Sequence, residues 1–254
     1  MAEIEYVRNQ NVATITLNRP ERRNALTVAM MRELGRMLAE AERDSAVRAL
    51  VLTGAGKVFC SGLDLTAMGS GEGELEGVLV DEVLLPLEGL SKPTLAALNG
   101  DALAGGLELA LHCDMRLAAP GARFGMPVAR IGIVVPYPLI LKLIDTVGPA
   151  ATSELLFTGE PVAAERALAM QMVNRVVAAE ALLETAAAMA ATIAGNAPLA
   201  VQAMKRAIVA GRTERARPAP EEVNQATARA RASADAREGL RAVLEKRKPQ
   251  FSGK

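Results

Sequence analysis

The stretch Ser91–Met115 constrains the fold most, because it combines a strand, a turn, a glycine pair and a helix that carries an acid. Its apolar run Thr94–Leu98 has Lys-Pro before it and Asn-Gly after it, which predicts a buried strand that enters a turn. A helix is then expected to begin near Gly105 and Gly106. Glycines there let the backbone approach a ligand closely, and the first N–H groups of a helix lack partners and carry the positive end of its dipole. The pattern predicts an oxyanion-binding site.

Glu108 falls in the first turn of that predicted helix, in a stretch made otherwise of Leu and Ala. A carboxyl group there could face a substrate held by the helix amides and act as a general acid or base. The alternative is structural, because Glu is favoured in any first helical turn and a glycine pair often serves only a tight turn. The residues by themselves leave both interpretations open.

The stretch resembles the signature of the crotonase superfamily, also called the enoyl-CoA hydratase/isomerase superfamily. The family pattern is K-P-x-x-A-x-x-N-G-x-A-x-G-G-G-x-E followed by a C-D pair, and Ala104 stands where the first of the three glycines is usual. The resemblance implies that Glu108 is the acid/base and that Gly105 donates its N–H to a thioester oxygen. The residues in register are Lys92, Pro93, Ala96, Asn99, Gly100, Ala102, Gly105, Gly106, Glu108, Cys113 and Asp114.

A second glycine-bearing segment, Thr53–Leu65, reads TGAGKVFCSGLDL. Glycines before Lys57 suggest a phosphate loop, but the Walker spacing is absent and Val58 stands where the magnesium-binding hydroxyl is needed. The segment instead resembles the family's T-G-x-G-x-x-F-x-x-G-x-D-L. In that family the residue after the last glycine of this motif donates its N–H to the thioester oxygen, which implies Leu63 as the partner of Gly105.

The segment LNRPERRNALT, residues 17–27, resembles the family's L-N-R-P-x-x-x-N-A-L, which places a basic side chain and an Ala backbone near the nucleotide end of coenzyme A. The substrate's phosphates are expected near Arg22 or Arg23, since a pyrophosphate needs cations. Coenzyme A enters as part of the thioester substrate, so no separate cofactor and no metal site are expected. The expected coenzyme A-binding residues are Arg22, Arg23, Ala25, Ser61, Gly62, Leu63, Asp64 and Leu65.

The segment Phe124–Leu139, FGMPVARIGIVVPYPL, departs from the pattern of a two-acid hydratase, F-G-x-P-E-x-x-x-G-x-x-P-G-x-G-G. Aligned without gaps, the second glutamate falls on Val128, so the second acid is missing. The V-P-Y run resembles one in the family's methylmalonyl-CoA decarboxylases, where it lies two residues nearer the preceding glycine. Tyr137 could present its hydroxyl to an acyl group or be a packed ring with a solvated tip.

His112 is the single histidine of the chain and lies four residues after Glu108, on about the same helix face. The family pattern does not use that position, and a histidine is often merely packed or solvated. A Ser-His-Asp set is not expected either, because the chain has no G-x-S-x-G elbow.

Composition narrows the class of partner. Among 254 residues, 29 basic and 29 acidic side chains balance, and no long run of one sign occurs, so neither nucleic acid nor a membrane surface is expected as a partner. Cys60 and Cys113 fit a reducing compartment rather than a disulfide framework or a zinc site. The first ten residues lack a signal pattern, so a cytoplasmic enzyme is expected.

The chain order predicts an α/β protein. A hairpin of Ile4–Val7 and Val12–Leu17, a helix over Ala25–Glu42 and a strand over Val47–Thr53 imply a parallel sheet. Thr66–Leu79 is Gly- and Glu-rich and predicts a mobile surface loop. Further helices are expected at Asp81–Leu90 with a kink at Pro86, Leu139–Val147, Ala150–Phe157, Leu182–Ala194, Pro198–Ala210, Pro220–Arg231 and Asp235–Glu245, and short strands at Met115–Ala118 and Ala122–Phe124.

The resemblance covers nearly the whole chain and implies a spiral of ββα units. Residues 1–195 would form the core that binds acyl-CoA and residues 196–254 a helical region for trimer contacts, in a homotrimer or a dimer of trimers. Two backbone amides would stabilise a thioester enolate, with a single glutamate acid/base, in a lyase or isomerase of fatty acid metabolism. The shared mechanism serves hydration, a double-bond shift or decarboxylation like that of methylmalonyl-CoA decarboxylase, and a non-catalytic acyl-CoA-binding member is the rival.

Overall fold

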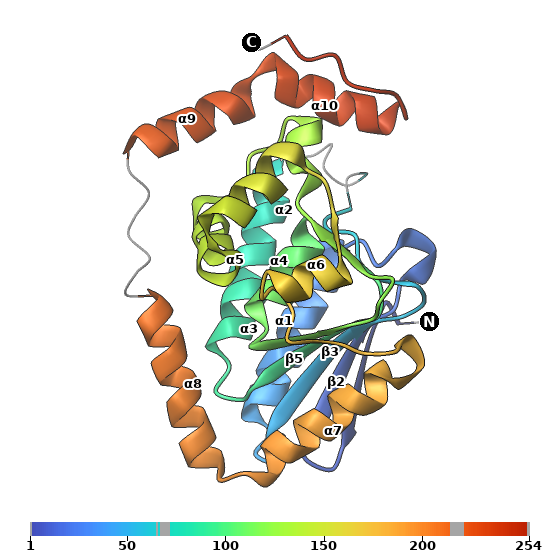
Figure 1. Cartoon of the computed structure of the whole chain (residues 1–254), viewed down its shortest axis with the longest axis vertical. Helices are drawn as coiled ribbons and strands as arrows, with labels where there is room; N and C mark the ends of the chain where they lie inside the picture. Colours follow the sequence, from blue (N-terminus) through green and yellow to red (C-terminus); the bar gives the residue numbers. More distant parts are fainter. Residues whose placement is uncertain (1, 65, 67–71, 214–220, 253–254) are drawn as a thin grey trace.

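The computed structural model describes residues 2–64, 66, 72–213 and 221–252, and the strands within them form two sheets (Figure 1). The larger sheet has the order β1-β2-β3-β5-β7-β10 and the smaller sheet the order β4-β6-β8-β9. The strands of the larger sheet are β1 (Ile4–Asn9), β2 (Val12–Leu17), β3 (Ala49–Gly54), β5 (Thr94–Leu98), β7 (Met115–Ala118) and β10 (Arg175–Val176). The strands of the smaller sheet are β4 (Val58–Cys60), β6 (Asp101–Leu103), β8 (Arg123–Gly125) and β9 (Val162–Ala163).

The N-terminal hairpin and the parallel sheet are both as predicted. β1 and β2 pair antiparallel with Ile4 opposite Leu17, whereas β2, β3, β5 and β7 run parallel to one another. Helix α1 (Val28–Arg43) supplies the long connection from β2 to β3 that a parallel pair requires.

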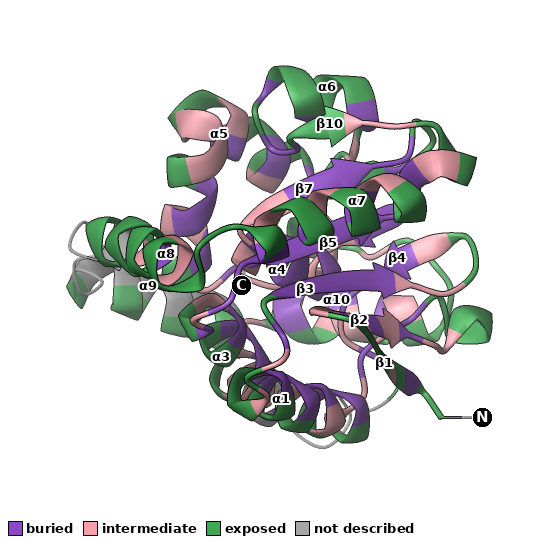
Figure 2. Ribbon diagram, turned by 90° about the horizontal axis from the view of Figure 1, so that it is seen from below, coloured by how far each residue is buried: buried purple, intermediate pink, exposed green. Residues whose placement is uncertain are grey.

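Strand β5, the predicted organising strand, is buried at all five positions. Successive side chains of a strand face opposite sides of the sheet. Leu95 and Ala97 accordingly join the cluster formed with α7 (Leu182–Gly195), and Ala96 and Leu98 join the main core cluster that also contains the buried face of α1. Figure 2 shows the buried strands between these two helices. Coverage of both faces explains the continuous apolar run in the sequence.

Helix α1 begins three residues later than the predicted Ala25–Glu42. Leu26 is held in a parallel bridge with Leu63, since its N–H donates to the Gly62 carbonyl at 2.8 Å. The Thr27 side chain then caps the helix by accepting from the Met30 N–H at 3.1 Å. The first residues of the expected helix therefore pair with the segment of Leu63 instead of becoming helical.

The chain from Glu72 to Gly89 is helical, which corrects the prediction of a surface loop over Thr66–Leu79. The loop prediction rested on Gly and Glu content, whereas the buried Leu75, Leu79 and Val83 recur at helical spacing. Residues 65 and 67–71 lie outside the described residues. The three parts are α2 (Glu72–Val78), the π-helical turn η3 (Leu79–Leu84) and α3 (Leu85–Gly89).

Pro86, which was expected to kink a helix over Asp81–Leu90, lies in the first turn of α3 directly after the wide turn η3. The two helices predicted on either side of Gly148 form α5 (Tyr137–Thr158), and Gly148 interrupts it with non-helical φ and ψ of 78° and 167°. The three-residue strands β4 and β6 were not predicted, because a run so short carries almost no periodicity.

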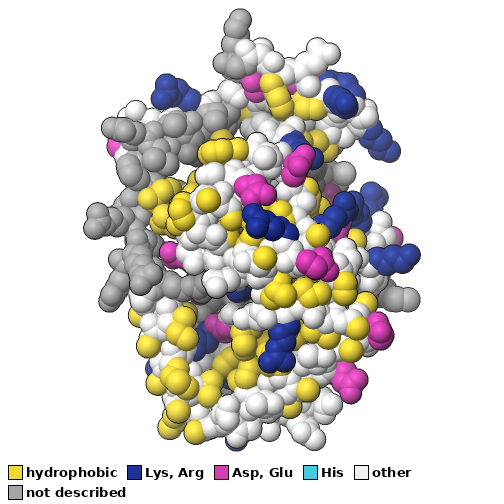
Figure 3. Space-filling model, viewed as in Figure 1, with side chains coloured by type: hydrophobic (Ala, Val, Ile, Leu, Met, Phe, Trp, Pro, Cys, Tyr) yellow, Lys and Arg dark blue, Asp and Glu magenta, His cyan; other side chains and the backbone are white. Residues whose placement is uncertain are grey.

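The C-terminal helices lie apart from the sheet, with α8 to its left and α9 and α10 above it in Figure 1. Leu199, Met204 and Ile208 of α8 are exposed, and Figure 3 shows hydrophobic side chains gathered over this helix. Trimer contacts through this region and the division at residue 195 stay predictions. None of the described helices has the length and apolarity that crossing a bilayer requires. The helices are α4 (Gly105–His112), α6 (Ala164–Ala169), α8 (Pro198–Thr213), α9 (Glu221–Ala232) and α10 (Ala234–Leu244).

Candidate active site

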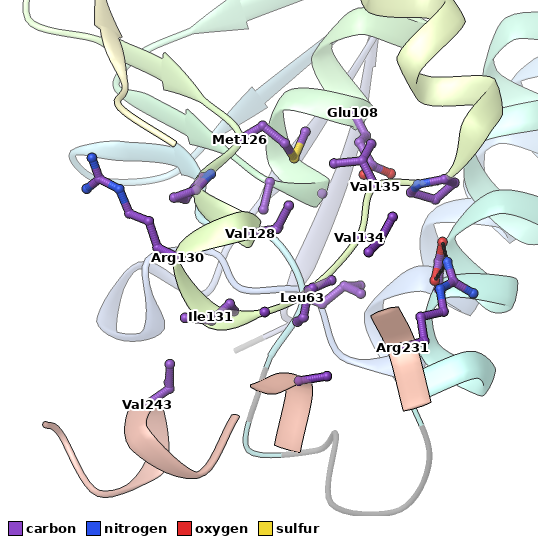
Figure 4. A pocket seen from close by; sticks show the side chains of 18 of the residues that line it. Leu63, Glu108, Met126, Val128, Arg130, Ile131, Val134, Val135, Arg231 and Val243 are labelled. Atoms are coloured by element: carbon purple, nitrogen blue, oxygen red, sulfur yellow. Dashed lines mark hydrogen bonds and ion pairs between the residues drawn. The ribbon is translucent and has the colours of Figure 1, made fainter. Parts of the chain in front are cut away.

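A cavity of about 540 Å³ lies between α4, the α2–η3 segment and the C-terminal helices (Figure 4). Its size is that of a small-molecule site rather than a packing defect. One wall carries Leu63, Gly105 and Glu108, three residues predicted to act together from segments far apart in the sequence. The other described lining residues are Ser61, Glu76, Leu79, Ala104, Met126, Pro127, Val128, Arg130, Ile131, Gly132, Ile133, Val134, Val135, Pro136, Arg231, Ala236 and Val243.

The backbones at Leu63 and Gly105 are in contact. A Cβ placed on Gly105 would lie 3.6 Å from the Leu63 nitrogen and 3.5 Å from the Gly62 Cα. Among the described residues, neither the Leu63 nor the Gly105 N–H has a hydrogen-bond acceptor. Glycine is required at Gly106, because a Cβ there would lie 2.1 Å from the Cys60 carbonyl oxygen. The tight packing of α4 on β4 thus brings two free amide donors to one wall of the cavity.

Ala104, the residue that replaces the usual glycine, has a strained backbone. Its φ and ψ are 48° and −125°, a combination that an L side chain rarely adopts. Its N–H donates to the Gly125 carbonyl at 3.0 Å, and its carbonyl accepts from the Glu108 N–H at 3.0 Å. Such strain, of the order of 1–3 kcal/mol, typically occurs where a site fixes the chain conformation.

Glu108 lies in the first turn of α4 and is 8% exposed. Burial, with a further contribution from the negative charge of Glu76, raises the pKa of its carboxyl group to about 7. The group can therefore be protonated or ionised near neutral pH, which suits a general acid or base. The structure thus favours the functional interpretation of Glu108 over its being an ordinary first-turn residue.

Three other residues singled out in the sequence differ in placement. Val128, at the position of the missing second acid, lines the cavity from the short 3₁₀ turn η4 (Pro127–Ile131). Tyr137 and His112 are not among the described residues that line the cavity. The His112 Nδ1 lies 2.7 Å from the Glu108 carbonyl, so this ring interacts with the backbone of its own helix.

Glu76 and Arg231 are cavity residues that sequence reasoning missed. The guanidinium of Arg231 on α9 binds both carboxylate oxygens of Glu76 on α2, at 2.9 and 3.0 Å. Glu76 was missed because its segment was predicted to be a surface loop. The helical spacing of Leu75 and Leu79 was the signal that could have predicted a helix there. Arg231 gave no local signal, because its partner lies 155 positions away in the chain.

The two segments expected to bind coenzyme A run side by side. The Ser61 N–H donates to the Arg23 carbonyl at 3.1 Å, one step before the Leu26–Leu63 bridge. Ser61 lines the cavity, while Gly62 has a φ of 100° at the turn that leads to Leu63. The segments therefore adjoin the cavity, as their predicted role requires.

The remaining expected contacts lie outside the set of cavity-lining residues. Arg22 belongs to a 3₁₀ turn and is exposed, and Ala25 follows it. Arg23 is half exposed and contacts Asp101 at 3.3 Å. The carboxylate of Asp64 binds Arg19 at 2.7 Å, which commits this side chain to holding the segment together. Leu65 lies outside the described residues.

The fold and the cavity define the class of protein. A family model described as enoyl-CoA hydratase/isomerase matches residues 7–254. The chain belongs to this family, has its α/β crotonase fold with a C-terminal helical region, and is an acyl-CoA-processing enzyme of the hydratase/isomerase type.

Particular relatives differ in the reaction for which they are named. The chain is 35% identical to the 2,3-dehydroadipyl-CoA hydratase of Escherichia coli over the full length of both, and 41% identical to the short-chain-enoyl-CoA hydratase of Clostridium acetobutylicum over 79% of this chain and 78% of the relative. A methylmalonyl-CoA decarboxylase in complex with 2-nitronate-propionyl-CoA superposes with a TM-score of 0.93 at 28% identity, covering 100% and 99% of the chains. Carnitinyl-CoA hydratase from Mycobacterium avium gives a TM-score of 0.87 at 35% identity, covering 99% of each.

Proposed function

We propose that this enzyme stabilises the enolate of an acyl-CoA thioester with the N–H groups of Leu63 and Gly105 and moves a proton at the α-carbon with Glu108. The observation that carries the proposal is the single cavity that contains the Leu63–Gly105 backbone contact together with a carboxyl group of raised pKa.

The amide pair would act on the thioester oxygen. When the α-carbon gains or loses a proton, negative charge develops on that oxygen, and fixed N–H donors stabilise it without having to reorient. The mostly apolar lining strengthens this interaction, because water competes less for the charge. Only the backbone of Leu63 is needed for this role, so its apolar side chain is compatible with it.

Glu108 would transfer the proton. A pKa of about 7 leaves both forms populated at neutral pH, so the group can donate to an enolate or accept from an α-carbon. Val128 leaves the position of the usual second acid apolar, so the chemistry that Glu108 alone supports is protonation of an enolate or a double-bond shift.

Coenzyme A would lie along the segments of Arg23 and Ser61. Arg22 or Arg23 would contact its phosphates, and the rest of coenzyme A would lie along Ala25 and along Gly62, Leu63 and Asp64. The backbone of Arg23 adjoins the cavity-lining Ser61 and its side chain is 55% exposed, which supports this placement.

Decarboxylation is the second candidate reaction. The similarity in fold to a methylmalonyl-CoA decarboxylase, together with Val128, favours it over fast two-acid hydration. Loss of carbon dioxide leaves the same enolate, which the same amides would hold and Glu108 would protonate.

The enzyme would assemble from several copies of the chain and act in the cytoplasm. The exposed apolar side chains of α8 support contacts between copies, in a homotrimer or a dimer of trimers. Cys60 and Cys113 are buried free thiols, and burial raises the pKa of each to about 12. Unreactive free thiols fit the cytoplasm.

The test is incubation with crotonyl-, 3-enoyl- and methylmalonyl-CoA and product identification by mass spectrometry. Exchange of the α-protons of butyryl-CoA in D₂O is measured in parallel, because it needs only the amide pair and one base. Glu108→Gln is expected to abolish exchange and turnover. Exchange that survives this substitution would refute the role of Glu108, and inertness toward every thioester would leave the rival, a non-catalytic acyl-CoA-binding protein.

A further inference from the structure

The cavity holds two carboxyl groups in opposite surroundings. Among its described lining residues the charged ones are Glu76, Glu108, Arg130 and Arg231. Arg130 turns away from the cavity (Figure 4), where it donates to the Thr158 carbonyl at 3.2 Å. Glu76, Glu108 and Arg231 are therefore the charged groups that a bound acyl chain would meet.

Among the described residues, Glu108 is buried and forms no ion pair, whereas Glu76 is paired with Arg231. Among the described residues the Glu108 carboxyl has no hydrogen-bond partner. Glu76 instead pairs with Arg231, whose Nη2 donates to both carboxylate oxygens at 3.0 and 2.9 Å and so restricts the orientation of the carboxylate. Two carboxyl groups in such different surroundings are the usual candidates for an acid and a base.

The packing of α2 and η3 places Glu76 on the helix face that lies toward Gly105. Leu79 follows Glu76 by three residues, so the two share a helix face. A Cβ on Gly105 would lie 3.2 Å from the Leu79 Cδ2, which places this face against the first turn of α4. The charge of Glu76 also raises the pKa of Glu108, so the two carboxyl groups interact across the cavity.

We propose that Glu76 is the second carboxylate of this site and that it accepts the proton of the water molecule that adds to an enoyl-CoA, with Arg231 as its positioning residue. The inference rests on the proposed function and deepens it, because it supplies from α2 the group that Val128 lacks. It makes hydration, rather than only a proton shift, available to this chain.

As the water oxygen bonds to the β-carbon, Glu76 takes one proton from that water. The double-bond electrons move onto the thioester oxygen at the Leu63 and Gly105 amides, and protonated Glu108 then gives its proton to the α-carbon as they return. Glu76 is left protonated and Glu108 ionised. Glu76 then releases its proton to solvent, to which its side chain is 26% exposed, and Glu108 takes one up.

Two assays, hydration and α-proton exchange, distinguish a failure of this inference from a failure of the proposed function on which it rests. Glu76→Gln is expected to lower kcat for hydration of crotonyl-CoA by about 100- to 10,000-fold. It should lower α-proton exchange of butyryl-CoA far less, because exchange needs no water activation. Glu108→Gln should abolish both. The matched control is Glu82→Gln, since the Glu82 side chain is 42% exposed, pairs with Arg32 at 3.6 Å and is not among the described cavity residues.

Variants of Arg231 test whether this residue positions Glu76 or only supports the fold. Arg231→Met should lower kcat for hydration by about tenfold with KM nearly unchanged, and Arg231→Lys should recover most of the loss. Equal losses of hydration and exchange in Glu76→Gln, or hydration at the wild-type rate, would overturn the inference while leaving Glu108 in place. A wild-type protein that exchanges protons but hydrates no enoyl-CoA would overturn it as well.

Discussion

Arg19 donates to Asp64 at 2.7 Å, with 15% and 11% of the two side chains exposed, and this ion pair joins the arginine-rich segment to the segment that carries Leu63. Arg19 also donates to the Ala25 carbonyl at 3.2 Å, and the Asp64 N–H donates to the Leu26 carbonyl at 2.9 Å. The position of Leu63 at the cavity wall is therefore supported by a largely buried ion pair between two residues that are not among the described cavity-lining residues.

Removing one partner of this pair is expected to destabilise the protein. Arg19→Met leaves the buried Asp64 carboxylate with its hydrogen bonds from Thr66 but without a counter-ion, which should lower the free energy of unfolding by about 3 kcal/mol. Urea unfolding measures the change. Arg36→Met is the control, because Arg36 pairs with Glu33 on an exposed helix face and its loss should cost less than about 1 kcal/mol. Equal effects would mean that the buried pair contributes no more than a surface pair.

Gly105→Pro removes one of the two proposed donors. Gly105 is the first residue of α4, a position where proline keeps a helix intact. Turnover is expected to fall by about 100- to 1000-fold, the usual effect of losing one such donor. Circular dichroism checks the fold, and Val28→Pro, at the first position of α1, is the control for a proline at a helix start. Turnover near the wild-type rate in Gly105→Pro would remove this amide from the mechanism.

Ala104→Gly is expected to stabilise the protein. Glycine adopts the φ of 48° and ψ of −125° without the strain that an alanine Cβ brings. Relief of that strain exceeds the added entropy of the unfolded chain, so the gain should be about 1 kcal/mol in urea unfolding. Ala102→Gly in β6 is the matched control and should destabilise. A loss of stability in Ala104→Gly would show that the alanine is not strained in solution.

Glu108 should make stability depend on pH. Its pKa is about 7 in the folded protein against an ordinary 4.5, so the folded state binds this proton more tightly than the unfolded state. The stabilisation is complete below pH 4.5 and is lost as pH rises to 7, by about 3 kcal/mol at 1.36 kcal/mol per unit. Glu108→Gln, which cannot ionise, should match the wild type near pH 4.5 and exceed its stability by that amount at pH 8. Parallel unfolding curves for the two proteins would contradict the raised pKa.

The arginines are tested by binding. Replacing Arg22 and Arg23 together by Ala should weaken the affinity for free coenzyme A by about tenfold at low salt and less at high salt, because phosphate contacts are ionic. Titration calorimetry at two salt concentrations measures this, with Arg36→Ala as a control for lost surface charge. Unchanged affinity would count against phosphates at this place.

Much of the scaffold and of the site follows from short-range patterns in the sequence. Alternation predicted the hairpin of β1 and β2, and the punctuated apolar run predicted β5 and the start of α4 at Gly105. The grouping of Leu63, Gly105 and Glu108 in one site came instead from the resemblance of two glycine motifs to those of the family. The hairpin, β5 and the start of α4 depend on neighbours in the chain, which periodicity and turn chemistry can report.

Only the tertiary structure determined the contacts between segments that are far apart in the sequence. Leu26 lies outside the helix expected at Ala25–Glu42 because it pairs with Leu63. Composition suggested a loop where the chain forms α2, which packs against α1, and η3, which packs against α1 and α4. The pairing of Glu76 with Arg231 depends on the placement of α9 beside α2. The second carboxylate of the cavity is held by the same contact. An ion pair between residues so far apart leaves no local pattern, because its energy comes from a geometry that the whole fold creates.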